Sequence, residues 1–250
     1  VEAWASARVE ADKRASKEAS NKAGADRMLS MIGEIAVTMP GAPERSPVRG
    51  AGIKRALGTL VADRMLDRPM DFAEIARLVG GDETTDAERG RKLVNNAVYK
   101  IRKLLGNDAI EADRGSVRLR DEVIAIDLLA LDRSLKSATA AIDGGNIAPA
   151  LDDLRHSLAL FGQGPVWPGL YDPFFEAARS ELEWRLRSTL LRGATALAEA
   201  GDPAGATHLL ELGRTAMPGD EEIVEQLVAM LERQGKFVEA ERLRMDNEAV

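Results

Sequence analysis

Cysteine is absent from this 250-residue chain, and histidine occurs only twice, as His156 and His208. A chain without thiols has no disulfide, thiol nucleophile, zinc finger or iron–sulfur site. Two histidines leave little material for a metal site or a catalytic triad. We therefore expect that the protein is not an enzyme and that it needs no metal and no cofactor.

Long apolar runs are missing as well. No stretch reaches the ~18–20 apolar residues that a transmembrane helix needs, and the start of the chain lacks the apolar segment of a secretory signal. With 45% hydrophobic and 30% charged residues, the composition is that of an ordinary globular protein. We expect a cytoplasmic protein with no membrane partner.

Aromatic residues are few and unevenly placed. The chain has five Phe, three Trp and two Tyr, and six of these ten lie between Phe161 and Trp184. Large rings bury much apolar surface, so such a cluster more often packs a core than binds a ligand. We interpret this segment as a packing nucleus.

The formal net charge of −7 is divided unequally along the chain. Residues 1–120 have 22 basic and 18 acidic side chains, whereas residues 121–250 have 12 basic and 23 acidic ones. This asymmetry indicates two domains with different partners. Nucleic acid is expected at the first half alone, because the second half would repel phosphate.

The first 50 residues show weak patterns of helix and strand. Alanines at every fourth position from Ala3 to Ala23 predict a linker helix over residues 1–30, with a short packing or dimer seam as the alternative. Residues 31–39 partly alternate, which predicts a short strand or one arm of a hairpin. Three prolines in residues 40–50 predict a loop.

Three helices and a hairpin are predicted next. Asp71 and Glu74 form a capping-box pattern at the start of the second helix. The third helix is the longest and stops at Gly106. The predicted elements are helices over residues 53–66, 72–79 and 86–105 and a β-hairpin over residues 109–119.

From Asp127 onward the pattern is helical and contains a repeat. Gly145, Gly201 and Gly235 are each followed five residues later by an alanine and, three or four residues further on, by a leucine. The last two glycines are 34 residues apart, the period of a tetratricopeptide helix pair. We predict an all-α, tetratricopeptide-like domain, with an irregular helical bundle as the alternative.

The helix over residues 86–105 combines an apolar face with a basic one. No carboxylate occurs between Arg89 and Leu105, whereas surface helices usually mix both signs of charge. Charge of one sign favours a polyanionic partner, and asparagines beside the cations can hydrogen-bond base edges. Docking of this face on the acidic second half is the alternative. The basic face and its flanks consist of Arg89, Arg91, Lys92, Asn95, Asn96, Tyr99, Lys100, Arg102 and Lys103.

Two helices, a basic helix and a hairpin with Arg114, Arg118 and Arg120 make up a winged helix-turn-helix arrangement. Residues 28–126, and above all LVNNAVYKIRKLLG at 93–106, resemble the OmpR-type winged helix of response regulators. The chain departs from that family twice. Leu-Val-Gly at 78–80 replaces a tryptophan, and Ser-Val follows Gly115 where the wing usually has Gly-Tyr.

Residues 145–186 resemble the bacterial transcriptional activator domain. They contain an Ala-Leu helix, a Gly-Pro-x-x-Pro-Gly-Leu turn, aromatic residues and then Ala-x-Arg-x-x-Leu. The order of the two domains resembles that of activators of the antibiotic-regulatory-protein type. The fold class expected is mainly α: an α/β winged helix-turn-helix DNA-binding domain over residues 31–126, then an all-α tetratricopeptide-like domain over residues 127–250.

The resemblance implies a DNA-binding transcriptional regulator, expected to be an activator. Its implied partners are double-stranded DNA with directly repeated sites, a second copy of the chain as a homodimer, and RNA polymerase, which the loop over residues 80–85 would contact. We expect Lys92, Asn95, Asn96 and Tyr99 to face the major groove, and Arg89, Arg91, Lys100, Lys103, Arg114 and Arg118 to bind phosphates.

A protein-interaction adaptor is the alternative function. In that case the winged helix no longer binds DNA, and a tetratricopeptide-like groove binds a peptide or protein. The altered wing supports this hypothesis. The two hypotheses differ in one structural expectation: the adaptor buries the basic face of the 86–105 helix against another element, whereas the regulator exposes it.

Overall fold

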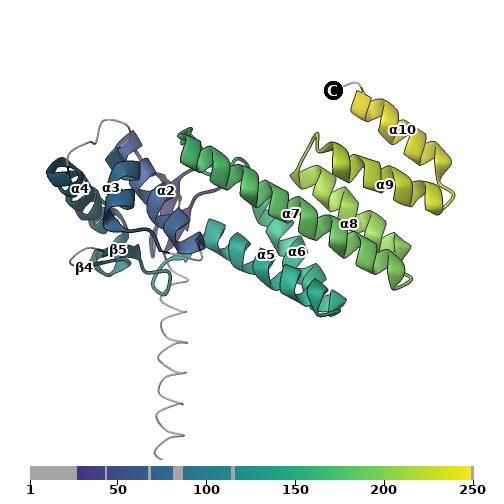
Figure 1. The fold of residues 1–250 in the computed structure, drawn as a ribbon, viewed down its shortest axis with the longest axis horizontal. Helices are drawn as coiled ribbons and strands as arrows, with labels where there is room; N and C mark the ends of the chain where they lie inside the picture. Colours follow the sequence, from purple (N-terminus) through teal and green to yellow (C-terminus); the bar gives the residue numbers. More distant parts are fainter. Residues whose placement is uncertain (1–26, 43, 67–68, 81–86, 114–115, 249–250) are drawn as a thin grey trace, which may run out of the picture. The chain divides into compact units, whose positions relative to one another are not determined.

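The computed structural model describes residues 27–42, 44–66, 69–80, 87–113 and 116–248, which form two compact units. The first unit comprises the described residues up to Leu129 together with Trp167–Leu170. The second comprises Ala130–Val166 and the described residues from Tyr171 onward. Figure 1 labels helices α2 to α10 and strands β4 and β5. The predicted fold class is confirmed, because an α/β unit is followed by an all-α unit.

A small four-stranded sheet of order β3-β2-β1-β6 forms one part of the first unit. β1 is antiparallel to β2 and parallel to β6, so Leu29 pairs with both Val37 and Ile126. All three side chains are buried. The strands are β1 (Met28–Ser30), β2 (Ala36–Thr38), β3 (Ser46–Pro47) and β6 (Ala125–Ile126).

The predicted linker helix over residues 1–30 is wrong at its end. Residues 28–30 form β1, because their backbone pairs with β2 and β6. The rest of that prediction, up to residue 26, lies outside the described residues. The segment 31–39 contributes β2 after a turn at Gly33, whose φ of 73° suits glycine.

The three helices and the hairpin of the first unit agree with the predicted segments. They are α2 (Ala51–Met65), α3 (Phe72–Gly80), α4 (Ala87–Leu105), β4 (Ile110–Asp113) and β5 (Ser116–Leu119). Asp71 caps α3, since its side chain accepts a hydrogen bond of 2.8 Å from the Glu74 backbone N–H. A single 3-10 turn, η2 (Asn107–Ala109), joins α4 to β4.

Six described helices form the second unit, and α7 to α10 lie side by side in sequence order, as Figure 1 shows. The repeat seen in the sequence marks the turns of three helix pairs. Gly145, Gly201 and Gly235 have φ between 72° and 85° at these turns, and the alanines five residues later are buried. The helices are α5 (Asp127–Asp143), α6 (Ile147–Phe161), α7 (Pro173–Glu199), α8 (Pro203–Ala216), α9 (Glu221–Arg233) and α10 (Phe237–Glu248).

Small residues bring neighbouring helices of this stack close together. A Cβ atom at Gly213 of α8 would overlap the Leu190 side chain of α7. A Cβ atom at Gly193 of α7 would lie 2.8 Å from Leu154 Cδ1 of α6. Leu154 and Leu190 are fully buried, so neither has free space to move into.

The aromatic cluster packs two cores rather than one. Trp167 is buried in the first unit, where its backbone N–H donates a 2.9 Å hydrogen bond to the Met31 carbonyl oxygen. Phe175 is buried in the second unit. The packing interpretation is confirmed for these two rings and wrong for Tyr171 and Trp184, which are exposed. The predicted second domain, residues 127–250, thus contains a segment that belongs to the first unit.

Candidate nucleic-acid interface

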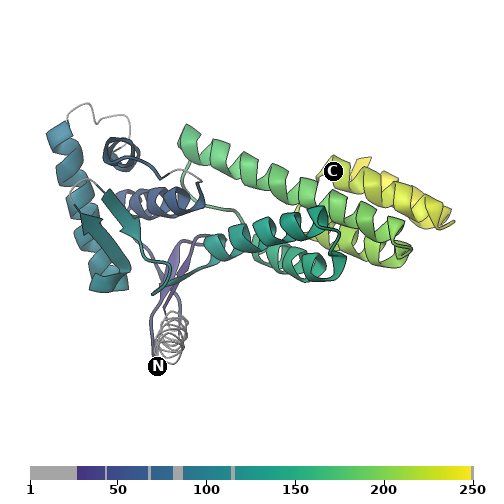
Figure 2. The same cartoon turned by 60° about the horizontal axis from the view of Figure 1, so that its bottom comes forward.

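The position of α4 follows from its apolar face. Val94, Val98, Ile101 and Leu105 are buried, and Ala97 is half-buried. They lie three or four residues apart, so they form one stripe along the helix. The stripe packs on α2 and α3, and Figure 2 shows β4 and β5 beside α4. The opposite face of α4 consequently points to solvent.

The structure brings eight of the ten predicted site residues together on that exposed face and its flanks. All eight side chains are exposed, including Tyr99, which is 59% exposed. Arg118 lies apart from them on β5 and is half-buried, and Arg114 lies outside the described residues. The eight are Arg89, Arg91, Lys92, Asn95, Asn96, Tyr99, Lys100 and Lys103.

The cations of this face have few internal partners. Lys92 Nζ lies 2.8 Å from Glu88 Oε1, but both side chains are about three-quarters exposed, so the pair is weak. Lys103 Nζ lies 5.0 Å from the centre of the Tyr99 ring, a cation–π distance. Arg91 and Lys100 make no ion pair with any described residue. Arg91 and Lys100 are therefore available to an external anion.

Two arginines that are not part of the exposed basic face fix the carboxyl end of α4. Arg102 donates a 3.1 Å hydrogen bond to the Ile110 carbonyl oxygen of β4. Arg27 donates to the Leu105 carbonyl oxygen and, at 2.6 Å, to Asp108. This hydrogen bond lowers the pKa of the Asp108 carboxyl. Sequence reasoning missed the role of Arg27, because 81 residues separate it from Asp108 and no local pattern relates them.

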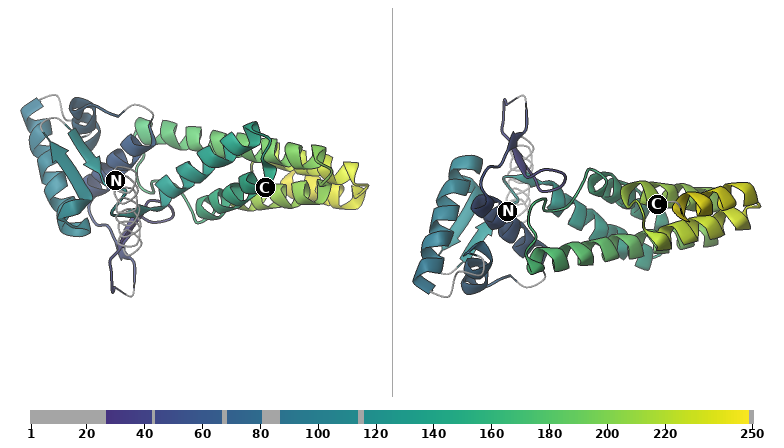
Figure 3. Two further views of the ribbon diagram at one scale, coloured as in Figure 1. Left: turned by 90° about the horizontal axis from the view of Figure 1, so that it is seen from below. Right: turned by 90° about the horizontal axis from the view of Figure 1, so that it is seen from above.

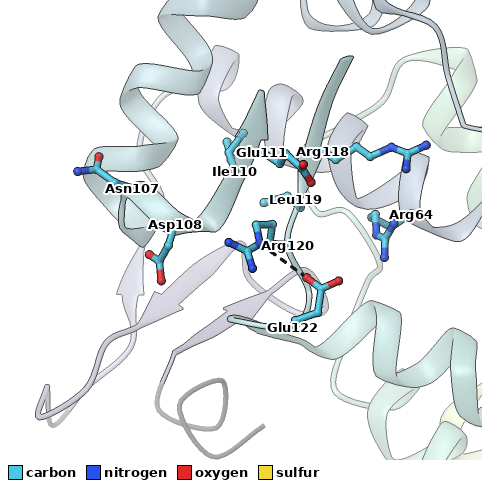
Figure 4. Close-up of a pocket in the computed structure, with 9 residues that line it drawn as sticks. All are labelled: Arg64, Asn107, Asp108, Ile110, Glu111, Arg118, Leu119, Arg120 and Glu122. Atoms are coloured by element: carbon cyan, nitrogen blue, oxygen red, sulfur yellow. Dashed lines mark ion pairs between the residues drawn. The ribbon is translucent and has the colours of Figure 1, made fainter. Parts of the chain in front are cut away.

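The hairpin has a different electrostatic character from α4. Arg118 lies opposite Glu111 in the register of β4 and β5, and Arg120 Nε lies 4.0 Å from Glu122. A hollow of about 660 Å³ lies beside these strands, where Figure 4 shows side chains of both signs. Arg118 is therefore a weaker phosphate candidate than the α4 cations. The hollow is lined by Arg64, Asn107, Asp108, Ile110, Glu111, Arg118, Leu119, Arg120 and Glu122.

Buried groups that the sequence did not single out hold the frame of the first unit. The Asp127 carboxylate accepts backbone hydrogen bonds from Met31 at 2.8 Å and Leu128 at 2.7 Å. Burial raises the pKa of this carboxyl, although the hydrogen bonds oppose the shift. The Asp127 carboxylate joins the β1–β2 turn to the start of α5.

The end of α3 departs from the family that the first unit resembles. At the position where that family has tryptophan, Leu78 and Val79 are buried instead.

Two other kinds of functional feature do not occur in the described part of the chain. No three histidine, aspartate or glutamate side chains there are placed to hold a metal ion. No helix there combines the length and apolarity needed to cross a membrane. The basic face of α4 is the feature from which a function can be argued.

Comparison with known proteins adds a family and a fold. The family model of the bacterial transcriptional activator domain matches residues 126–244. The fold is similar to that of Mycobacterium tuberculosis EmbR, solved in complex with a low affinity phosphopeptide, with a TM-score of 0.62 and 21% identity. This similarity covers 90% of the present chain and 59% of the EmbR chain. No curated protein sequence matches the chain.

Proposed function

We propose that the protein, in which residues 126–244 match the family model of the bacterial transcriptional activator domain, is a transcriptional regulator that binds double-stranded DNA through α4. One observation carries the DNA-binding part. The exposed face of α4 presents cations and amides without a carboxylate between Arg89 and Leu105, while the other face is buried. A duplex supplies the negative charge that this face lacks.

The residues of α4 divide into two roles. Lys92, Asn95, Asn96 and Tyr99 contact base edges in the major groove, whose width of about 12 Å admits a helix. Asparagine pairs with adenine through two hydrogen bonds, and lysine donates to guanine acceptors. The other cations bind phosphates and fix the register of the helix on the duplex; on α4 these are Arg89, Arg91, Lys100 and Lys103. Lys92 leaves Glu88 when DNA binds, at little cost because the pair is exposed.

The second unit supplies protein contacts in this proposal. The protein binds directly repeated sites as a homodimer or larger assembly and recruits RNA polymerase to activate transcription. The loop proposed to contact RNA polymerase, residues 80–85, lies almost wholly outside the described residues. The acidic charge of residues 121–250 supports this division of roles, because it repels phosphate and leaves DNA to the first unit.

The exposure of the basic face favours a regulator over an adaptor. An adaptor without DNA binding has no use for unpaired surface cations, and it was expected to bury them against another element. Arg91 and Lys100 are exposed and make no ion pair with the described residues.

A salt series with a random duplex of about 30 base pairs tests the proposal. If six cations neutralise phosphates, log affinity falls against log salt concentration with a slope of roughly −5. The variant Lys92→Ala/Asn96→Ala/Lys103→Ala removes one phosphate contact, that of Lys103, and two base contacts, so its slope is shallower by roughly 0.9 and its affinity is lower. Fluorescence anisotropy of labelled DNA measures both slopes.

The matched control is Arg214→Ala/Gln226→Ala/Lys236→Ala, which removes the same kinds of group from exposed positions in the second unit. We expect its slope and affinity to equal those of the wild type. Circular dichroism verifies that each variant keeps its helices. No binding by the wild type at low salt, or an equal loss in both triple variants, would contradict DNA binding through α4.

A further inference from the structure

The last helix of the stack exposes apolar side chains. Among the described elements, α10 makes substantial contacts with α9 only. Figure 3 shows α10 at the end of the second unit's helices. Val238 is 85%, Phe237 66% and Met245 65% exposed. Exposed apolar side chains that share one face of a helix often mark a site of protein contact. The outer face of α10 therefore has the character of a contact surface.

This surface occupies the side of α10 that lies opposite α9. Ala240 is fully buried and Leu243 is half-buried, so these two residues mark the side of α10 that packs on α9. Val238 and Met245 are seven residues, or about two turns, apart, so they lie one above the other on the opposite side. Glu241 and Arg242 lie between them and are exposed. We refer to Val238, Glu241, Arg242 and Met245 as the outer stripe.

The outer stripe is complementary to itself in reverse. Its order is apolar, acidic, basic, apolar, and its centre lies between Glu241 and Arg242. When two copies of α10 pair antiparallel about this centre, Val238 lies opposite Met245 of the partner copy. Glu241 then lies opposite Arg242 of the partner copy, and the twofold axis repeats both contacts.

We propose that the outer stripe of α10 is a self-association surface, whose occupant is α10 of a second copy of this chain. Two symmetric Glu–Arg pairs form at its centre, with an apolar contact on each side. Arg242 makes no ion pair with any described residue. The bond of 3.3 Å from Arg244 to Glu241 is exposed and leaves one oxygen of that carboxylate available.

A face of this size supports a weak dimer rather than a permanent one. One helix of 12 residues buries less surface than a standard stable interface requires, so association is concentration-dependent. The proposal names a surface for the homodimer proposed above, but it does not require DNA. Its test is performed without DNA, so its failure and a failure of DNA binding are distinguishable.

Sedimentation velocity of the full chain tests the surface through charge reversal. Wild-type protein is measured from about 1 μM to about 1 mM, the range in which weak interfaces dissociate. Glu241→Arg places two arginines opposite each other at each pair, and Arg242→Glu places two glutamates there. Each variant alone is expected to weaken the dimer at least about tenfold, because like charges face each other.

The decisive sample is the equimolar mixture of these two variants. In a mixed dimer both central positions of one chain are arginines and both of the other are glutamates, so every pair is again of opposite charge. The mixture is therefore expected to dimerise about as strongly as the wild type. Glu183→Arg and Arg214→Glu on α7 and α8 make the same charge changes on exposed positions elsewhere.

Each of these control variants is expected to dimerise like the wild type, alone or mixed. A wild type that stays monomeric, or a mixture of Glu241→Arg and Arg242→Glu that does not recover dimerisation, overturns the proposal.

Discussion

The arginines and lysines of α4 and those of α7 have opposite environments. On α7, Arg179, Arg185, Arg187 and Arg192 each bind a carboxylate, and three of the four reach a different helix or its cap. On α4, the ion pair of Lys92 joins it to Glu88 in its own helix, and Arg91 and Lys100 have no ion-pair partner among the described residues. The arginines of α7 hold the second unit together, whereas the cations on the exposed face of α4 point to solvent.

This difference distinguishes cations that stabilise the fold from cations that bind a partner. A cation that stabilises a fold has its carboxylate inside the same unit, and removing it leaves an unpaired buried acid. A cation that serves binding has either no carboxylate partner or an exposed one, as Lys92 has in Glu88, so its removal changes affinity and leaves stability nearly unchanged. The distinction can be tested at single residues.

The largest effect is expected at Arg185. Its Nη1 lies 2.9 Å from Oδ1 of Asp132, whose side chain is 5% exposed. Arg185→Leu leaves that carboxylate with Lys136 alone, and we expect the free energy of unfolding to fall by about 2–4 kcal/mol. Urea denaturation followed by circular dichroism measures the loss. Lys100→Leu on α4 is the control. An equal loss of stability in both variants would show that the cations of α4 and α7 contribute equally to the fold.

The next effect concerns packing rather than charge. Gly213→Ala forces a methyl group against the buried Leu190 side chain, so we expect a loss of about 1–3 kcal/mol in the free energy of unfolding. Gly52→Ala in α2 is the matched control, because its Cβ would meet no atom within 4 Å. Thermal denaturation of both variants measures the difference. Equal melting temperatures would show that α7 and α8 can separate without cost.

A smaller effect is expected at Lys100, and it concerns DNA alone. Lys100→Ala removes one phosphate contact, which reduces affinity up to about tenfold at low salt and makes the salt slope shallower by roughly 0.9. Its free energy of unfolding stays within about 0.5 kcal/mol of the wild type. Anisotropy titrations and urea denaturation together check both statements. A stability loss as large as that of Arg185→Leu would place Lys100 among the structural cations.

The smallest effect concerns the pH dependence of the first unit. Because burial raises the pKa of Asp127, the folded state keeps a proton that the unfolded chain has already released. The stability contributed by this protonation is complete below the ordinary pKa of aspartate and is lost as the pH rises through the raised pKa. We expect the free energy of unfolding of the wild type, relative to Asp127→Asn, to decrease over that window. A difference that is constant or increases with pH would contradict the shift.

Periodicity predicted the long helices well, and short elements less so. α4 has enough turns for Val94, Val98 and Ile101 to define a face, and the alanines after Gly201 and Gly235 define a helix pair. The strands of the sheet have two or three residues, too few to show alternation, so the sequence pattern predicts a helix where β1 lies. Contacts such as that of Arg27 with Asp108 depend on the tertiary fold and leave no local signal.

The candidate site was predictable for the same reason as the helices. The exposed positions of α4 follow from its apolar stripe, which fixes the opposite face. Arg118 was harder to interpret, because strand alternation places it on the hairpin without showing that Glu111 lies opposite. Tyr171 and Trp184 were assigned to a core by composition, which does not show which face of a segment is covered.

Because Trp167–Leu170 belongs to the first unit, the polypeptide leaves that unit after Leu129, returns to it at Trp167 and leaves it again after Leu170. The chain up to Leu129 therefore lacks one segment of the first unit. A fragment ended at residue 126 would lack both the indole that fills its interior and the N–H that satisfies the Met31 carbonyl oxygen. We therefore expect an excised first unit to fold stably only when residues 167–170 are supplied as a linked segment, which calorimetry of fragments with and without that segment measures.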